Sequence, residues 1–263
     1  MTSIYQIISE LEKNDESVVL CTIVKSQGST PRRVGSKMLV YPNGKSVGSI
    51  GGGDLEHRVL DEAWIAFSEG KPRTLTYHLV NPKRGDPGVC GGTIEVFVEP
   101  ILSTPTVVII GAGHVGKAIV HLAKWLGFRV VVSDDRGEFC NPESAPGADA
   151  YYPLPMEELA SQLKITRRTF LAITSRGSAL DALGLPSLLT SQAAYIGVIG
   201  SKRRWLTTVK ALKAKGVPEE LIARVHSPMG IELNAETPEE IAVSVMAEIL
   251  MIRDKGTGKS MKD

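Results

Sequence analysis

The chain has 263 residues, of which 43% are hydrophobic and 22% charged, and its formal net charge is +1. This balance is that of a globular protein, and we expect neither a nucleic-acid nor a membrane partner. Three cysteines, no secretory leader pattern at the start and no CxxC or HExxH zinc motif favour a cytoplasmic protein without disulfides or a metal site.

Residues 1–102 are predicted to form a small α+β domain. Helical spacing of apolar residues predicts a first helix near residues 4–11, and a second helix is expected after residue 53. Strands are expected over residues 17–24, over both arms of a hairpin at Asn43-Gly44, and over residues 93–100, where Pro100 should end the strand.

Three stretches of this domain are candidates for ligand binding. The loop with Arg32 and Arg33 suits phosphate or carboxylate recognition, although a polar surface turn has the same composition. Gly51, Gly52 and Gly53 offer a backbone nest for an anion, but Asp54, the expected helix cap, would itself bind the N–H groups and repel an added anion. Cys90 lies between turns, where its sulfur either faces a cleft or is an inert buried thiol.

Residues 103–254 are predicted to form a Rossmann-like domain, and residues 255–263 a mobile polar tail. Short apolar strands are expected to alternate with helices, which is typical of a doubly wound parallel sheet. The expected strands are residues 106–110, 128–133, 169–174 and 195–199, and the expected helices are residues 115–126, 156–163, 203–215 and one that begins after Thr237.

A GxGxxG motif follows the first of these strands, at Gly111, Gly113 and Gly116. It opens a helix, and the next strand ends at Asp134, which is the context of a dinucleotide-binding fingerprint. The pattern predicts a phosphate at the helix N-terminus and a ribose hydroxyl on Asp134. A Rossmann turn that only packs its helix is the alternative.

Three further residues at predicted helix starts are candidate ligand contacts. His114 lies in the glycine turn, where it either contacts a ligand phosphate or bonds nearby backbone. Ser201 and Arg203 follow the strand at residues 195–199, where a basic helix start favours an anion, although a solvated run of charges looks the same.

Together these motifs resemble the xanthine dehydrogenase accessory family, also called the XdhC/CoxI family. The matching segments follow the family's order and cover nearly the whole chain: "VKSQGSTPRRVGSKMLV", "VGSIGGGDLEHRVL", "VCGGTIEVFVEP", "IIGAGHVGKAIVHLAKWLGFRVVVSDDR", "YIGVIGSKRR" and "HSPMGIELNAETPEEIAVSVMAEIL". The resemblance implies a small N-terminal domain followed by a Rossmann domain.

The resemblance also implies a non-catalytic maturation role. Members of the family bind molybdenum cofactor (molybdopterin, in some bacteria with a nucleotide), protect it during sulfuration and help to insert it into a molybdenum hydroxylase. The implied partners are the apo form of a xanthine dehydrogenase-type hydroxylase and a cysteine desulfurase, and we expect a homo-oligomer. Many members have a cysteine where this chain has Asp54, whereas Cys90 matches the family's "CGG" element.

Two other functions compete with this one. The GxGxxG turn and Asp134 suggest an NAD(P)-dependent oxidoreductase, but no acid–base constellation follows the Rossmann unit. A regulator that senses a nucleotide through the Rossmann unit is the third hypothesis. The small molecule that co-purifies with the protein distinguishes the three, because each predicts a different ligand.

Overall fold

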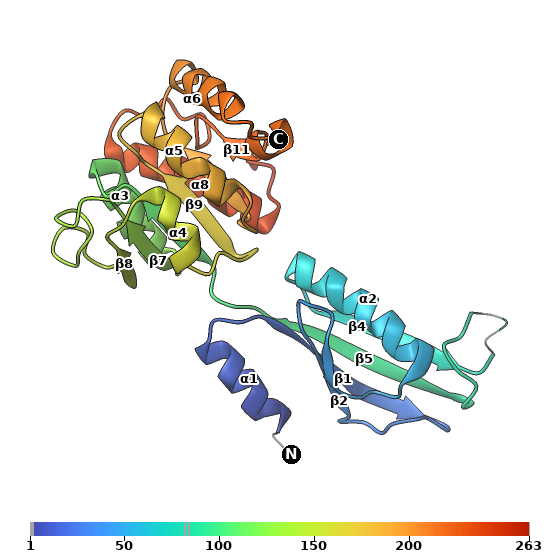
Figure 1. Ribbon diagram of the computed structural model, residues 1–263. Helices are drawn as coiled ribbons and strands as arrows, with labels where there is room; N and C mark the ends of the chain where they lie inside the picture. Colours follow the sequence, from blue (N-terminus) through green and yellow to red (C-terminus); the bar gives the residue numbers. More distant parts are fainter. Residues whose placement is uncertain (1–2, 82, 84, 263) are drawn as a thin grey trace. The chain divides into compact units, whose positions relative to one another are not determined.

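A computed structural model describes residues 3–81, 83 and 85–262, and the chain divides into two compact units, 1–103 and 104–263 (Figure 1). The elements of the first unit are α1 (Ile4–Lys13), β1 (Val18–Gln27), β2 (Lys37–Val40), β3 (Ser46–Gly48), α2 (Gly53–Glu69), β4 (Arg73–Leu79) and β5 (Gly92–Ile101). Its strands form one antiparallel sheet in the order β3-β2-β1-β5-β4.

Alternation along β1 explains how this sheet holds a helix on each face. Val19, Cys21 and Ile23 point into a core with the apolar face of α2. Val18 and Leu20 point to the opposite face, where α1 covers them. Successive residues of a strand point to opposite faces, so a strand with apolar residues at every position is buried on both sides. The predicted first helix and the hairpin are confirmed, and Ser3 is the N-cap of that helix.

One strand prediction in this unit was wrong, and one strand was missed. β5 does not end at Pro100 but continues to Ile101, pairing with β1 at Val18. On its other side β5 is paired only as far as Val98, opposite the first residue of β4, so Pro100 lies where just one neighbouring strand is present. An N–H is therefore dispensable there. β4 was not predicted, although Leu75, Tyr77 and Leu79 alternate with polar residues along it.

The second unit has a doubly wound α/β architecture. Its elements are β6 (Thr106–Ile110), α3 (His114–Trp125), β7 (Arg129–Ser133), β8 (Ala150–Tyr152), α4 (Met156–Gln162), β9 (Thr169–Ile173), α5 (Ser178–Leu189), β10 (Tyr195–Val198), α6 (Lys202–Ala214), α7 (Glu219–Ile222), β11 (Val225–His226) and α8 (Pro238–Asp254). Neighbouring strands of this sheet pair in parallel throughout. β8, α5, α7 and β11 were not predicted.

The strand order of this sheet is β8-β7-β6-β9-β10-β11, the 3-2-1-4-5-6 order of a Rossmann fold. The predicted fold class is thus confirmed. One face of the sheet packs on α3 and α8, and the other packs on α4, α5, α6 and α7. The connections reverse direction between β6 and β9, and folds of this type bind ligands outside the carboxyl ends of the strands at that point.

Candidate functional site

A cleft of about 300 Å³ lies at the carboxyl ends of β6, β7 and β9. Its polar side consists of the glycine turn after β6, residues 133–136 after β7 and residues 174–176 after β9. Residues 154–157 together with Leu180 and Leu183 supply a more apolar side. The cleft therefore has a polar side at the glycine turn and a second side of more apolar chemistry.

The three glycines of the GxGxxG motif have different roles in the turn. Gly111 has φ +110°, and a Cβ on it would lie 2.6 Å from the carbonyl oxygen of Thr174. A Cβ on Gly116 would lie 2.1 Å from the carbonyl oxygen of Gly111. Both positions need glycine for the fold itself. Gly113 has φ −72°, and a Cβ there would have no described atom within 4 Å, so this position leaves room beside the cleft.

The N-terminus of α3 faces this room. Its N-cap is Gly113, no described side chain caps the helix, and its first turn has no acidic residue. The first N–H groups of a helix have no partner within the helix, and the helix dipole is positive at that end. An anionic group of a ligand is the partner that this geometry accepts best.

Asp134 has hydrogen-bond partners within the chain, and the ribose binding that the sequence suggests for it stays a prediction. It is 4% exposed, and its carboxylate accepts hydrogen bonds from Ala112 N at 2.8 Å and from the N, Nε and Nη2 atoms of Arg136 at 3.0, 2.9 and 2.9 Å. Four donors fill the acceptor positions of a carboxylate. Burial alone would raise the pKa of Asp134, but the hydrogen bonds from Arg136 and Ala112 lower it below the ordinary value. Asp134 thus stays charged and fixes the glycine turn against β7.

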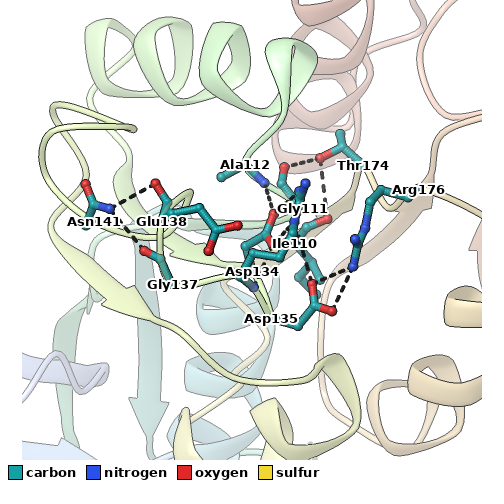
Figure 2. A network of polar contacts seen from close by, with 11 residues as sticks. Ile110, Gly111, Ala112, Asp134, Asp135, Gly137, Glu138, Asn141, Thr174 and Arg176 are labelled. Carbon is teal, nitrogen blue, oxygen red and sulfur yellow. Dashed lines mark hydrogen bonds and ion pairs between the residues drawn. The ribbon is translucent and has the colours of Figure 1, made fainter.

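Two arginines that sequence reasoning missed line the same cleft, Arg136 and Arg176. Arg136 stacks its guanidinium 3.9 Å from the centre of the Phe139 ring. Arg176 donates to both oxygens of Asp135 at 2.9 and 2.8 Å, as Figure 2 shows. Their positions just after β7 and β9 were the available signal, because parallel strands bring those loops to one edge of the sheet.

The other predicted contacts of the Rossmann unit lie outside this cleft. His114 lines a separate groove of about 470 Å³ between α3 and α8, together with Lys117, His121 and Val243. Ser201 uses its hydroxyl to cap α6, where it accepts from the N–H of Arg204 at 3.2 Å. Ligand binding by His114 and Ser201 stays a prediction.

Arg203 is exposed, whereas its neighbour Arg204 turns inward. The Nη2 atom of Arg204 donates to Ser175 Oγ and to Asp181 Oδ2, both at 2.8 Å, and Asp181 is fully buried. This bridge ties α6 to the loop after β9. Arg204 therefore supports the wall of the cleft, while the ligand role that the sequence suggested for Arg203 stays a prediction.

In the first unit, three segments far apart in sequence meet at one end of the sheet. A Cβ on Gly92 would lie 2.3 Å from the carbonyl oxygen of Ser29, which places the β4–β5 loop against the loop after β1. A Cβ on Gly51 would lie 2.7 Å from Pro31 Cγ, which places the glycine triplet against the same loop. The structure therefore brings together the loop of Arg32 and Arg33, the triplet Gly51–Gly53 and the loop of Cys90.

The backbone nest at the glycine triplet already holds a carboxylate. Glu56 Oε1 accepts from the N–H groups of Ile50, Gly51 and Gly52 at 3.0, 3.2 and 2.9 Å, and from Ser49 Oγ at 2.7 Å. Burial alone would raise the pKa of Glu56, but these hydrogen bonds outweigh it and lower the pKa. The anion that this nest binds in the folded chain is thus Glu56, which the sequence did not reveal.

Asp54 is not the helix cap that the sequence predicted. The N-cap of α2 is Gly52, and Asp54 lies inside the first turn, where it pairs with Arg58 at 2.8 Å. Glycine at the N-cap has no side chain that could accept from the nest N–H groups, and Glu56, one turn further along the helix, accepts from them instead.

The remaining candidates at this end of the sheet are open to solvent. Arg32 and Arg33 are exposed, and within the described residues neither guanidinium has a partner. Cys90 is exposed, whereas Cys21 and Cys140 are buried. Burial raises the pKa of Cys21 to about 12, which makes it a poor nucleophile.

The part of the chain that the structure describes contains no group of three or more His, Cys, Asp or Glu side chains suited to a metal ion. Within residues 3–81, 83 and 85–262, no helix combines the length and the apolar composition that a membrane span requires. The cleft of the second unit and the loop end of the first unit's sheet both offer backbone N–H groups and guanidinium groups, which are suited to anions.

Comparison with known proteins decides the family. The family model described as the XdhC Rossmann domain matches residues 107–249, over half of the chain, and the model of the XdhC and CoxI family matches residues 11–78. The chain belongs to the XdhC family. The matched Rossmann segment contains the GxGxxG turn and most of the loops that line the cleft.

Three relatives illustrate the range of this family. The uncharacterised protein YqeB of Escherichia coli K12 is 36% identical over 263 residues, 98% of this chain and 48% of YqeB. A probable subunit of xanthine dehydrogenase from Bacillus subtilis 168 is 31% identical over 163 residues, 62% of this chain and 47% of that protein. The molybdenum cofactor insertion chaperone PaoD of E. coli K12 is 23% identical over 269 residues, 90% of this chain and 84% of PaoD. The chain thus spans about half the length of the first two relatives.

Proposed function

We propose that this XdhC-family protein binds molybdenum cofactor, holds it while it is sulfurated and delivers it to the apo form of a xanthine dehydrogenase-type molybdenum hydroxylase. The observation that carries the proposal is the match of the XdhC Rossmann domain to residues 107–249, the segment with the anion-accepting turn. The names of two relatives, a cofactor insertion chaperone and a probable subunit of xanthine dehydrogenase, support the same role.

The residues of the cleft fit a phosphate-bearing cargo. Molybdenum cofactor has a phosphate, a pterin ring system and an anionic metal head. The N-terminus of α3, which no described side chain caps, and the open space at Gly113 suit a phosphate. Leu180 and Leu183 offer apolar contacts to a ring, and Arg176 offers a guanidinium. A nucleotide attached to the cofactor, or NAD(P), would use the same features.

The first unit offers a second set of groups for the cargo or for the proteins that exchange it. Arg32 and Arg33 present guanidiniums that have no partner among the described residues, and Cys90 presents the one exposed thiol among the three cysteines. A thiolate is a soft ligand that suits a molybdenum–sulfur centre better than the carboxylate of Asp54 does. We assign Cys90 to the sulfuration step, with a cysteine desulfurase as the source of sulfur, and we expect the protein to act as a homo-oligomer.

Substitution of Gly113 tests the cleft. In Gly113→Val the side chain would occupy the space between the turn and a phosphate, so we expect molybdenum cofactor binding to fall at least about tenfold while folding is retained. Gly256→Val is the matched control, because a Cβ at Gly256 meets Met251 at an ordinary 3.7 Å, away from the cleft. Titration of the purified protein with cofactor measures the difference. Equal affinities for wild type and Gly113→Val would refute the site. Co-purification of a nicotinamide nucleotide in place of a pterin would favour the oxidoreductase.

Substitution of Cys90 tests the sulfur chemistry. Cys90→Ser is nearly isosteric and the residue is exposed, so we expect unchanged stability and cofactor retention but loss of most of the hydroxylase activation. Cys140→Ser, at a buried thiol that donates to the Val132 carbonyl, is a control for general loss of thiols. Reconstitution of an apo-hydroxylase with each variant measures the effect. Full activation by Cys90→Ser would show that cofactor handling does not use this sulfur.

A further inference from the structure

More acidic than basic side chains line the Rossmann cleft, although its glycine turn is suited to an anion. The uncapped N-terminus of α3 accepts an anion, but three acidic and only two basic side chains line the cleft: Asp134, Asp135, Glu157, Arg136 and Arg176. Asp134 and Arg136 are joined by three hydrogen bonds, and the Ala112 N–H donates a fourth to the Asp134 carboxylate. The remaining arginine, Arg176, is bound to Asp135. An entering anion thus finds both guanidiniums already engaged.

The Asp135–Arg176 ion pair crosses the turn where the anion would bind. β6 lies between β7 and β9, and Ile110 is level with Ser133 on one side and with Ile173 on the other. Asp135 and Arg176 therefore reach toward each other from the two flanking loops, past Gly111 (Figure 2). Their side chains are 42% and 50% exposed, so they can reorient without repacking a core.

The hydroxyl of Ser133, the last residue of β7, is a second observation that points to a ligand in this cleft. Ser133 is fully buried and lines the cleft, and its Oγ has no hydrogen-bond partner among the described residues. A buried hydroxyl without a partner costs free energy, and structures retain such groups where a ligand or water completes them. The polar groups around the turn are thus incomplete in the free chain.

We propose that the Asp135–Arg176 pair is an exchangeable strap, in which a phosphate-bearing ligand at the glycine turn replaces the Asp135 carboxylate as the partner of Arg176. The proposal rests on the proposed function for the presence of a ligand in this cleft, and it adds Arg176 as an anion-binding residue and Asp135 as its competitor. The guanidinium fork suits either partner, because carboxylate and phosphate both accept two parallel N–H bonds. Asp135 also opposes the ligand directly through like charge.

Substitutions of the two partners are expected to change affinity in opposite directions. Asp135→Asn removes the competitor and should tighten binding by roughly two- to fivefold. Arg176→Gln removes the anion partner and should weaken binding by roughly ten- to a hundredfold. Arg176→Lys keeps the charge without the fork and should fall between wild type and Arg176→Gln. An ion pair that only stabilised the fold would give changes of the same sign, or none.

Two probes are used with each variant of the full chain: molybdenum cofactor released from a hydroxylase, and adenosine diphosphate. Glu219→Gln and Lys213→Gln are the matched controls, because this exposed ion pair undergoes the same charge changes outside the cleft and should leave both affinities unchanged. Thermal unfolding should be nearly unchanged in all variants, because exposed pairs contribute little to stability.

Opposite shifts with either probe support the strap. Opposite shifts with adenosine diphosphate alone, and no binding of molybdenum cofactor, support the strap and overturn the proposed function. Binding of molybdenum cofactor that Asp135→Asn does not tighten, or that Arg176→Gln does not weaken, overturns the strap and leaves the proposed function standing. Failure of wild type and Asp135→Asn to bind either probe overturns both.

Discussion

The chain has two glycine-rich turns that lead into helices, and their backbone N–H groups have different partners. At Gly51–Gly53 the nest is filled by the carboxylate of Glu56, which comes from the first turns of the helix that follows. At the GxGxxG turn the helix has no acid in its first turn and no described side-chain cap, and Gly113 leaves space beside it. The N–H groups of the Gly51–Gly53 turn thus have a partner within the chain. The helix N-terminus at the GxGxxG turn has no described side-chain partner and is open to a ligand.

The difference teaches that glycine content alone does not identify an anion site. A glycine run makes N–H groups available, and the nearest carboxylate then decides whether they stay available. In the second turn the nearest carboxylate, Asp134, accepts only from Ala112 among the turn's N–H groups and takes its other three donors from Arg136. The helix N-terminus beyond Ala112 therefore remains for another anion.

The largest effect is expected at Gly116, the glycine that packs the open turn. Gly116→Ala would place a Cβ 2.1 Å from the carbonyl oxygen of Gly111, and a backbone atom cannot move aside cheaply. We expect a loss of about 2–3 kcal/mol or more in the free energy of unfolding. Urea denaturation followed by circular dichroism measures it.

Gly113→Ala is the control within the same motif. The φ of −72° suits any residue, and a Cβ would have no described atom within 4 Å, so we expect stability within about 0.5 kcal/mol of wild type. Equal destabilisation by both alanines would show that the open space at Gly113 is filled in solution and would remove the contrast between the two turns.

Much of the fold was predictable because its signals are local. The capping box of α8, with Thr237 and Glu240, is recognisable from four consecutive residues, and the structure confirms it. The apolar strand β6 and the glycine turn after it identify the Rossmann unit in the same way. Here the local preferences of the residues agree with the tertiary structure.

The missed elements depend on contacts that sequence periodicity does not encode. α5 contains Gly184 and Pro186, and it is apolar on several sides because it packs between neighbours. A Cβ on Gly184 would lie 2.5 Å from Met156, so close packing with α4 explains a glycine that reads as a helix breaker. Tertiary packing outweighs helix propensity in such a segment.

The site was predictable in position more than in chemistry. The glycine turn and the end of β7, which the sequence joined in one fingerprint, line the same cleft. The partner of each carboxylate was not predictable, because Asp134 is satisfied by Arg136 and Glu56 by a nest that the fold creates. Which of several nearby acids fills a set of donors depends on side-chain geometry that motifs do not specify.

A smaller loss of stability is expected at Glu56, whose carboxylate accepts from the N–H groups of the Gly51–Gly53 turn. Glu56→Gln removes a charged acceptor from the N–H groups of Ile50, Gly51 and Gly52, and we expect a loss of about 1–2 kcal/mol at neutral pH. Glu56 lies in the first of the two units, so the loss should be measured from the unfolding transition of that unit. Tyr41, Tyr77 and Trp64 are probes within that unit.

The stability that Glu56 contributes should decrease as the pH falls. The pKa of Glu56 is lowered from its ordinary 4.5 in the folded chain, so its stabilisation is fully present above about pH 5 and is lost as the pH falls through the lowered pKa. The difference in unfolding free energy between wild type and Glu56→Gln should therefore narrow in acid. A difference that is constant between pH 7 and pH 3 would show that Glu56 does not hold the nest as a carboxylate.

The smallest effect is expected at Asp54, the acid that the sequence singled out beside the same glycines. It is 58% exposed and, among the described residues, pairs with Arg58 alone, one helical turn away, so Asp54→Asn should cost about 0.3–0.5 kcal/mol. Salt screens an exposed pair, so this difference should vanish at about 1 M salt, whereas most of the Glu56→Gln difference should persist because it comes from hydrogen bonds in the nest. Denaturant titrations of both variants at low and high salt measure the contrast. A loss at Asp54 as large as that at Glu56, and insensitive to salt, would show that Asp54 organises the turn and that both glycine-rich turns depend on the acid nearest in sequence.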